Sequence, residues 1–275
     1  MTALNPATDD DRFSFTPFTR HPFFTHVNRW ILERVICPGR QVIVDLGCGP
    51  GAVTQLILER VRGQQPPPRV IGVDPSPSAL AKARTAISSR LAEFVQGSAE
   101  WLSKLVKSAD AVVFLNAIHL MPDKTSVLRE IRRVLKPGGL LAFNSTFFAG
   151  AYVEGTSGFW RRWIVRSVQA LRERGITVQH DGHAAAMEWL SAEQYSQVLK
   201  ATGYRPTTVE LLRVDMTAAS LADIGRFSLF IEGALPGVPL EEGSEALQTG
   251  LARTLDELKV DSVPRHWLEV VAEAE

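Results

Sequence analysis

Two hydrophobic spacings alternate along the first half of the chain. Short runs rich in apolar residues, typical of strands buried on both faces, occur at 42–46, 70–73, 92–96, 111–115 and 140–144. Between them, apolar residues recur every three or four positions, which predicts helices at about 52–61, 78–89, 100–106 and 123–135. An earlier helix is predicted over 25–36 and ends at Pro38 and Gly39. This alternation predicts an α/β fold, with a parallel sheet covered by helices on both faces.

The first predicted strand ends in a carboxylate and a glycine-rich turn. The stretch VIVDLGCGPG, residues 42–51, places Asp45 directly before glycines at 47, 49 and 51. The second strand also ends in an acid, Asp74. Ligands of open parallel sheets bind at the carboxyl ends of the strands, where glycine lets the backbone approach them closely. The alternative is a purely structural turn with Asp45 as a charge at the helix terminus.

The glycine spacing fits two nucleotide-like ligands. Gly47-x-Gly49-x-x-Ala52, with Asp74 as the ribose-binding acid, fits the dinucleotide fingerprint. Asp45-x-Gly47-x-Gly49-x-Gly51 fits a site for S-adenosylmethionine. Asp45 favours the second interpretation, because a carboxylate repels a pyrophosphate but attracts the cationic methionine end of a sulfonium cofactor.

Five stretches resemble, in order, the motifs of class I S-adenosylmethionine-dependent methyltransferases: VIVDLGCGPG, GVDPSPSAL, FVQGSAEWL, ADAVVFLNAIHLMPD and LREIRRVLKPGGLLAF. They cover roughly residues 40–146 and are most similar to the small-molecule branch that includes the ubiquinone and menaquinone biosynthesis methyltransferases. The resemblance implies a Rossmann-like, seven-stranded, mostly parallel sheet with helices on both faces, an antiparallel last strand and helical cap insertions. It also implies S-adenosyl-L-methionine as the cofactor and an enzyme that methylates O, N or C of a small molecule.

The resemblance assigns the cofactor site to residues at the ends of four strands: Asp45, Gly47, Cys48, Gly49, Gly51, Asp74, Pro75, Ser98, Ala99, Asn116 and Ala117. It implies that Asp74 binds both ribose hydroxyls with Pro75 against the adenine. Asn116 and Ala117 match the segment that lines the methionine end and faces the acceptor. Ser98 stands where the family commonly has aspartate, so the adenine contact is expected from Glu100 or from backbone. Cys48 needs only to be small in a crowded loop.

His119 is the candidate general base. It lies just beyond the fourth strand, near the expected entry of the acceptor, and imidazole titrates near neutrality. The alternative is that His119 only supports the cofactor pocket.

The resemblance also predicts how the chain is organised. An N-terminal helical and aromatic lid (1–39) precedes the cofactor-binding core (40–146), and a cap insertion over the acceptor pocket (147–190) follows. The rest of the core (191–275) contains a sixth strand at 207–214, a second helical insertion at about 217–259, and an antiparallel seventh strand at 265–272, inserted beside the sixth.

Aromatic and histidine side chains outside the core are the candidates for the acceptor pocket: Phe18, His21, Phe23, Phe147, Tyr152, Trp160 and His183. An aromatic pocket favours a lipophilic acceptor, as in quinone or natural-product biosynthesis. The alternatives are packing of an N-terminal helix and a stripe used to form a homo-oligomer. Arginines between 161 and 174 form either a patch for an anionic acceptor or a solvated helix face, and we favour the latter.

Charge and composition restrict the partners. Thirty basic and thirty acidic residues leave the 275-residue chain without net charge, so it has no general attraction for nucleic acid or an anionic membrane. Its two cysteines have no metal-ligand spacing, and no metal is expected. No apolar run reaches membrane-spanning length and no signal peptide is evident, which predicts a cytoplasmic protein.

Two other functions remain open. The scaffold can bind S-adenosylmethionine and direct a non-methylating reaction such as a cyclisation, because a fold does not fix a function. A methyltransferase of RNA or protein is the second, although the neutral charge argues against RNA.

Overall fold

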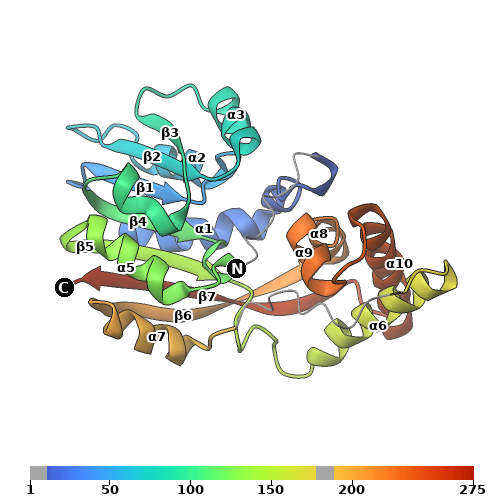
Figure 1. The fold of residues 1–275 in the computed structure, drawn as a ribbon. Helices are drawn as coiled ribbons and strands as arrows, with labels where there is room; N and C mark the ends of the chain where they lie inside the picture. Colours follow the sequence, from blue (N-terminus) through green and yellow to red (C-terminus); the bar gives the residue numbers. More distant parts are fainter. Residues whose placement is uncertain (1–10, 178–188) are drawn as a thin grey trace. The chain divides into compact units, whose positions relative to one another are not determined.

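Seven strands form one mixed sheet in the computed structural model, which describes residues 11–177 and 189–275 (Figure 1). Their order across the sheet is β3-β2-β1-β4-β5-β7-β6. The strands are β1 (Val42–Leu46), β2 (Arg69–Asp74), β3 (Ala92–Gln96), β4 (Ala109–Leu115), β5 (Leu135–Ser145), β6 (Tyr204–Thr217) and β7 (Ser262–Ala274). Strands β1 to β5 pair in parallel, whereas β7 runs antiparallel to β5. The predicted fold class is confirmed, including the antiparallel seventh strand between the fifth and the sixth.

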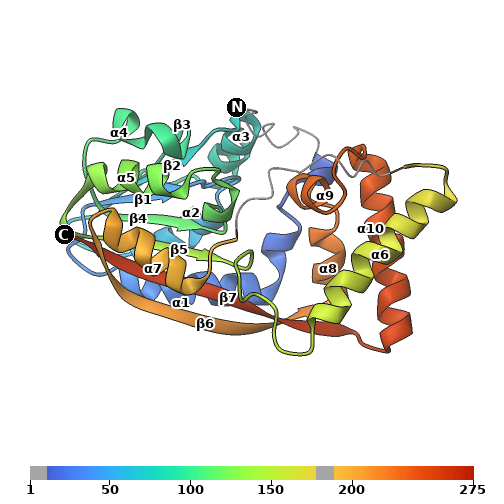
Figure 2. The same ribbon diagram turned by 60° about the horizontal axis from the view of Figure 1, so that its bottom comes forward.

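Ten α-helices connect these strands in the described residues: α1 (Pro22–Val35), α2 (Ala52–Arg60), α3 (Pro77–Ala86), α4 (Leu102–Leu105), α5 (Lys124–Val134), α6 (Ser157–Glu173), α7 (Ala192–Ala201), α8 (Ala218–Ile224), α9 (Ser228–Ala234) and α10 (Leu240–Leu258). Four short 3-10 helices, η1 to η4, lie at Asp11–Phe13, Phe18–Arg20, Ala99–Trp101 and Ile118–Leu120. Helices α1 and α2 pack together on one face of the sheet, and α4, α5 and α7 cover the other (Figures 1 and 2).

Local capping explains where several helices begin. The side chain of Asp123 accepts a hydrogen bond from the backbone of Ser126 at the start of α5. Ser191 and Gln194 form a reciprocal capping box at the start of α7. These side chains satisfy backbone groups that the first helical turn leaves without partners.

Strand β5 begins earlier than the sequence predicts. The stretch Pro137-Gly138-Gly139 is expected to separate the helix from a strand at 140–144, but β5 starts at Leu135, directly after α5. Its pairing with β4 shifts between Ala109 and Ala111, so the Pro-Gly-Gly stretch forms an irregularity within the strand. Gly138 has a φ of 73°, which glycine adopts without strain.

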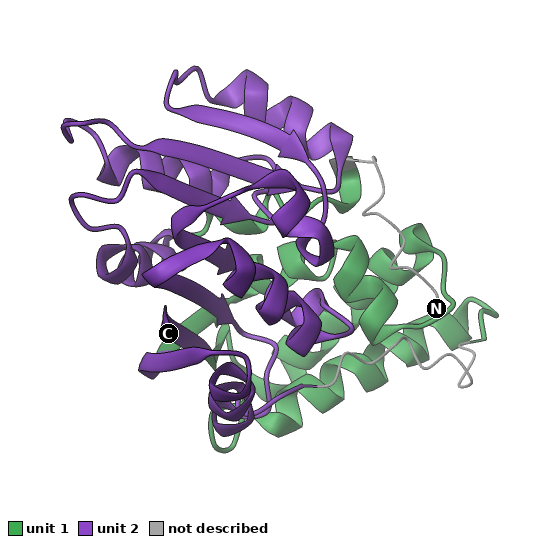
Figure 3. Ribbon diagram, turned by 60° about the vertical axis from the view of Figure 1, so that its left-hand side comes forward, with its two compact units in different colours: residues 1–21, 151–187, 213–266 green, residues 22–150, 188–212, 267–275 purple. Residues whose placement is uncertain are grey.

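The chain divides into two compact units (Figure 3). Unit 2 comprises 22–150, 188–212 and 267–275 and contains strands β1 to β5 with their helices. Unit 1 comprises 1–21, 151–187 and 213–266 and contains α6, α8, α9 and α10. Strands β6 and β7 each have one part in either unit. The four-part domain organisation expected from the sequence stays a prediction.

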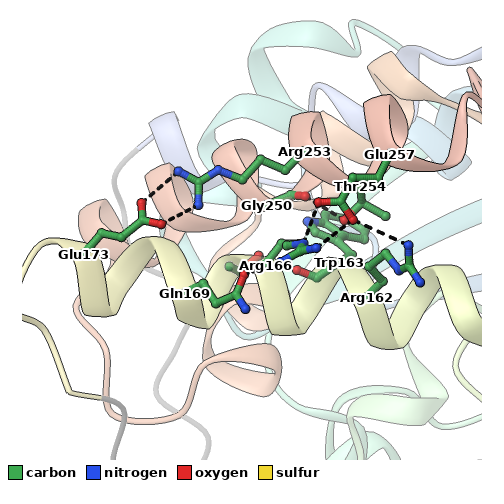
Figure 4. A network of polar contacts seen from close by, with 10 residues as sticks. Arg162, Trp163, Arg166, Gln169, Glu173, Gly250, Arg253, Thr254 and Glu257 are labelled. Carbon is green, nitrogen blue, oxygen red and sulfur yellow. Dashed lines mark hydrogen bonds and ion pairs between the residues drawn. The ribbon is translucent and has the colours of Figure 1, made fainter.

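Helices α6 and α10 pack closely along much of their length within unit 1 (Figure 4). The indole nitrogen of Trp163 donates to the Leu247 carbonyl at 2.8 Å. Gly250 permits this approach, because a Cβ there would lie 2.2 Å from Ser167 Oγ and 2.6 Å from the Ser167 backbone nitrogen. The absence of a side chain at Gly250 is therefore a packing requirement.

Ion pairs across these helices use several of the arginines predicted to be solvated. Arg162 and Arg166 both pair with Glu257, and Arg253 forms a bidentate pair with Glu173 (Figure 4). Such partly exposed pairs contribute little stability individually. They do, however, give these arginines intramolecular partners, which favours the structural interpretation over a patch for an anionic acceptor.

Replacing Gly250 by alanine should destabilise unit 1 by about 1–3 kcal/mol, because the new methyl group overlaps Ser167. Thermal unfolding followed by circular dichroism measures the effect. Gly158→Ala in α6 is the matched control, since a Cβ there meets nothing within 4 Å. Equal melting temperatures for the two variants would contradict the packing argument.

Candidate cofactor-binding site

The glycine-rich turn after β1 is attached to the end of β2. The backbone nitrogens of Gly47 and Cys48 donate to the Val73 carbonyl at 2.7 and 3.1 Å. Gly47, Gly49 and Gly51 have φ values of 68°, 52° and 95°, which side chains disfavour. At Gly51 a Cβ would also lie 2.7 Å from Ile87 Cδ1. The turn therefore needs glycine for its own geometry, and it leaves backbone rather than side chains facing the end of the sheet.

Asp45 is almost completely buried at the end of β1. Its Oδ2 accepts a hydrogen bond from Thr54 Oγ1 of α2 at 2.5 Å. Burial raises the pKa of Asp45 to about 7; the Thr54 hydrogen bond opposes this shift, while the nearby charge of Asp74 adds to it. Thr54 was missed by sequence reasoning, although its place nine residues after Asp45 in the first turn of α2 offered a weak signal.

Asp74 joins β2 to the glycine turn. Its Oδ2 accepts from the Gly49 nitrogen at 2.8 Å, and its Oδ1 accepts from the Ser76 nitrogen at 2.9 Å. Burial raises the pKa of Asp74, while these two amide hydrogen bonds lower it. Because each carboxylate oxygen has more than one lone pair, both oxygens retain capacity for a further hydroxyl donor. This arrangement fits two neighbouring ribose hydroxyls.

The end of β3 lies beside Asp74. The Gly97 nitrogen donates to the Asp74 carbonyl at 3.0 Å, and Gln96 Nε2 donates to the Pro75 carbonyl at 3.3 Å. Ser98 and Ala99 follow directly, where η3 begins; Ala99 is buried and the Ser98 side chain makes no capping hydrogen bond. The structure thus places these adenine-site candidates next to Asp74 and Pro75.

Asn116 and Ala117 complete the group at the end of β4. Ala117 lies against the glycine turn, because a Cβ on Gly47 would be 3.2 Å from Ala117 Cβ. Asn116 has a φ of 56°, a left-handed conformation that glycine adopts freely and that asparagine tolerates better than most other residues. All eleven candidate cofactor residues therefore lie at the carboxyl ends of neighbouring strands, although their binding roles stay predictions.

A buried polar network behind Asn116 was not found from the sequence. It consists of Asn28 of α1, Asn116, Asn144 of β5, and Trp267 and Glu269 of β7. The available signal was an asparagine or glutamate within an otherwise apolar helix or strand. Such a signal cannot name the partners, since these contacts link residues far apart in the chain.

His119 lies in η4 and contacts the end of β5. Its Nδ1 is 3.0 Å from Ser145 Oγ, and its ring centroid is 4.6 Å from that of Phe147. A serine hydroxyl and an aromatic ring can fix the orientation of an imidazole, as a base requires, but they fit a supporting role equally well. The catalytic role of His119 remains a prediction.

The acceptor-pocket candidates fall in both units. In unit 1, the Phe18 and His21 ring centroids are 6.1 Å apart, and His21 Nε2 lies 2.8 Å from Asp223 Oδ2. Tyr152 stacks on Trp160 in the same unit at 5.9 Å. In unit 2, Phe23 packs against Trp267, and Phe147 packs against His119. His183 lies outside the described residues.

The described ranges contain neither a metal cluster nor a membrane-spanning helix. Between residues 11 and 177 and between 189 and 275, histidine, cysteine and acidic side chains form no cluster of three or more that could hold a metal ion. In these same ranges, the helices are too short or too polar to cross a bilayer.

Comparison with known proteins agrees with this geometry. Residues 44–143 match the family model of a methyltransferase domain. The chain is 37% identical over 124 residues to trans-aconitate 2-methyltransferase of Azoarcus sp. (strain BH72), covering 43% of this chain and 44% of that protein. It is 33% identical over 119 residues to ubiquinone biosynthesis O-methyltransferase of Pseudomonas fluorescens (strain SBW25), covering 42% and 48% respectively.

A solved structure extends the likeness at the level of the fold. Phosphoethanolamine N-methyltransferase 2 of Haemonchus contortus, in complex with phosphomonomethylethanolamine and S-adenosylhomocysteine, superposes with a TM-score of 0.57 at 20% identity. The match covers 97% of this chain and 57% of that one. The fold is therefore that of Rossmann-like methyltransferases.

Residues 44–143 thus match a methyltransferase domain, and over this part the chain is similar to class I S-adenosylmethionine-dependent methyltransferases of small molecules. S-adenosyl-L-methionine is the methyl donor of this class. The chain spans less than half the length of these two curated relatives.

Replacing Asp45 by asparagine should change how stability depends on pH. Between about pH 4 and 7, folded wild-type protein binds a proton at Asp45 that the unfolded chain has lost, so this group's contribution to stability falls as pH rises and levels off above 7. An asparagine side chain cannot titrate. The free energy of unfolding of the variant should therefore rise relative to that of wild type by up to about 4 kcal/mol between about pH 4 and 7. Urea unfolding at a series of pH values measures the difference.

Asp110→Asn is the control variant, because the contribution of Asp110 to stability changes with pH in the opposite direction to that of Asp45. Although burial opposes the shift, hydrogen bonds from Lys136, Val42 and Gln41 hold the pKa of Asp110 below its ordinary value. Its contribution to stability is therefore present at neutral pH and lost on acidification. A difference between Asp45→Asn and wild type that does not vary with pH would contradict the raised pKa of Asp45.

Proposed function

We propose that the chain is a methyltransferase that transfers the methyl group of S-adenosyl-L-methionine to an oxygen, nitrogen or carbon of a small molecule. The observation that carries this proposal is the convergence of Asp45, the glycine turn, Asp74 and Asn116 at the carboxyl ends of β1, β2 and β4. A dinucleotide interpretation uses the same glycines, but the buried Asp45 beside them disfavours a pyrophosphate.

The residues fit the parts of this cofactor separately. Asp74 offers two oxygens that already accept from fixed amides and have lone pairs left for the ribose hydroxyls. The backbone of the glycine turn and the Asp45 carboxylate suit the methionine end, whose ammonium group is a donor and a cation. The cofactor, when bound, supplies an activated methyl group, so the protein needs no nucleophile of its own.

The remaining work of the chain is to align the acceptor, exclude water and, for a protonated acceptor, remove a proton. His119 is the proposed proton acceptor, because it lies three residues after Asn116 and Ser145 Oγ is within hydrogen-bond distance of its Nδ1. Asn116 and Ala117 are the proposed lining between the methyl group and the acceptor.

The acceptor is proposed to be a small, lipophilic metabolite. Both curated relatives are named for small molecules, trans-aconitate and ubiquinone, which supports a small acceptor. The aromatic ring of Phe147, which packs against His119, favours an apolar one. The reaction is tested by incubating the protein with methyl-labelled S-adenosylmethionine and a panel of small carboxylic, phenolic and quinone-like acceptors.

Mass spectrometry of the products decides between the candidate functions. A product that gains one methyl group, together with formation of S-adenosylhomocysteine, is the expected result. A product of unchanged mass would indicate cyclisation or another rearrangement, and label found in the RNA or protein fraction would indicate a macromolecular acceptor.

Replacing Asp74 by asparagine should weaken the binding of S-adenosylhomocysteine at least about tenfold, because the amide turns one acceptor oxygen into a donor facing the ribose. Calorimetric titration measures the affinity, with NADH as a control ligand. Asp110→Asn, at the opposite end of β4, should bind like wild type. Wild-type affinity in Asp74→Asn would remove Asp74 from the site.

A further inference from the structure

The most unusual buried group that the cofactor site leaves without a role is Glu269. It lies on β7 directly opposite Asn144 of β5, and its side chain is fully buried. Its Oε1 accepts from Asn144 Nδ2 at 3.3 Å, and its Oε2 has no hydrogen-bond partner among the described residues. A carboxyl group in such a place is costly for the fold, which makes a role in function worth seeking.

The hydrogen bonds lead from Glu269 to Asn116 through two amides. Asn144 Nδ2 donates to Glu269 Oε1 and also to Asn28 Oδ1, at 3.0 Å. Asn28 Oδ1 accepts in addition from Asn116 Nδ2 at 3.1 Å. Asn28 Oδ1 thus accepts from the side-chain amides of Asn116 and Asn144. The NH₂ group of Asn144 must therefore point toward Asn28 and Glu269, and the Oδ1 of Asn144 is left to accept from the backbone of Asn116.

Asn116 is held at both its backbone and its side chain by this network. Its backbone nitrogen donates to Asn144 Oδ1 at 2.8 Å, and its Oδ1 accepts from the Trp267 indole at 3.0 Å. Its φ of 56° lies in a region that even asparagine occupies less often than the right-handed helical and extended regions. The network holds the residue there through contacts from α1, β5 and β7 together.

Glu269 suits this role as a neutral acid. Burial raises its pKa well above the ordinary value, more than the Asn144 hydrogen bond and the charge of Arg34 on α1 lower it. A neutral carboxyl group accepts from Asn144 without placing an uncompensated charge in the sheet.

We propose that Glu269 is a positioning residue for the cofactor site, acting through Asn144 and Asn28 to hold Asn116 in its left-handed conformation. The inference rests on the proposed function, because Asn116 is there assigned to the methionine end of the cofactor. Glu269 would thus support, from the last strand β7, a cofactor site whose candidate binding residues lie at the ends of β1 to β4.

Substitution of Glu269 by methionine tests the proposal. Methionine is similar in size but cannot accept from Asn144, so Asn116 should relax in most molecules and the apparent dissociation constant for S-adenosylhomocysteine should rise about tenfold. Calorimetry reports affinity and the fraction of binding-competent protein separately. We expect the affinity to fall while the stoichiometry stays that of wild type.

Two further variants separate positioning from general stability. Glu269→Gln restores a neutral acceptor and should bind within about threefold of wild type. Tyr204→Phe removes another buried hydrogen bond of unit 2, from Tyr204 Oη to the Leu128 carbonyl, far from the carboxyl ends of the strands. It should lower the melting temperature and leave the affinity unchanged.

A double-mutant cycle tests whether Glu269 acts through Asn116. Glycine adopts a φ of 56° without support, so in the Asn116→Gly background Glu269→Met should weaken binding less than about threefold. If Glu269→Met does not fold, Asn28→Ala removes the shared acceptor from a helix instead. The same loss of about tenfold is then expected.

The outcomes are distinct. Wild-type affinity in the folded Glu269→Met or Asn28→Ala protein, or an equal loss in both Asn116 backgrounds, would overturn the positioning role and leave the proposed function standing. Failure of wild-type protein to bind S-adenosylhomocysteine would overturn the proposed function and this inference together.

Discussion

The pairing of β1 between β2 and β4 is the constraint on which the site depends. Parallel strands end at the same edge of a sheet, so this order brings the residues after Leu46, Asp74 and Leu115 together. The Val73 carbonyl then fixes the glycine turn by accepting from two of its amides. Asp74 and Asn116, which follow Asp45 by 29 and 71 residues in the chain, thereby lie at the same edge of the sheet. No local sequence pattern indicates this proximity.

Three buried carboxyl groups surround this edge, and each lowers the stability of the fold at neutral pH. Burial raises the pKa of Asp45, Asp74 and Glu269. Asp45 and Asp74 adjoin the glycine turn, where a cationic and hydroxyl-bearing ligand can compensate their burial. Glu269 lies behind them, where Asn144 donates a hydrogen bond to it and Arg34 supplies a nearby charge, and its neutral form suits a positioning role.

Local patterns in the sequence predicted the α/β fold and the strand ends that form the site, whereas the antiparallel last strand was expected only from the family resemblance. The strand over 42–46 and the strand over 92–96 have the predicted bounds, and Asp45 and Asp74 lie at strand ends as expected. These are features that a short window of residues determines, since a buried strand, a glycine turn and a capped helix each have a local signature. The early start of β5 at Leu135 was missed because a bulge depends on the partner strand.

The network around Asn116 shows what local patterns cannot supply. The hydrogen bond from Asn144 to Asn28 joins residues 116 positions apart, and that from Asn144 to Glu269 joins residues 125 apart. A sequence alone indicates that Glu269 is in an apolar strand, but not that an amide lies opposite it. The acceptor-pocket candidates present the same difficulty, because Phe18 and Tyr152 belong to unit 1 whereas Phe147 belongs to unit 2.

A crystal structure of the protein with S-adenosylhomocysteine tests most directly whether this edge of the sheet binds the cofactor. The ribose hydroxyls should lie within hydrogen-bond distance of both Asp74 oxygens, and the amino-acid end should lie between the glycine turn and Asn116. A ligand bound with its ribose away from Asp74, or a turn that makes no contact with it, would contradict the assignment of this edge of the sheet as the cofactor site.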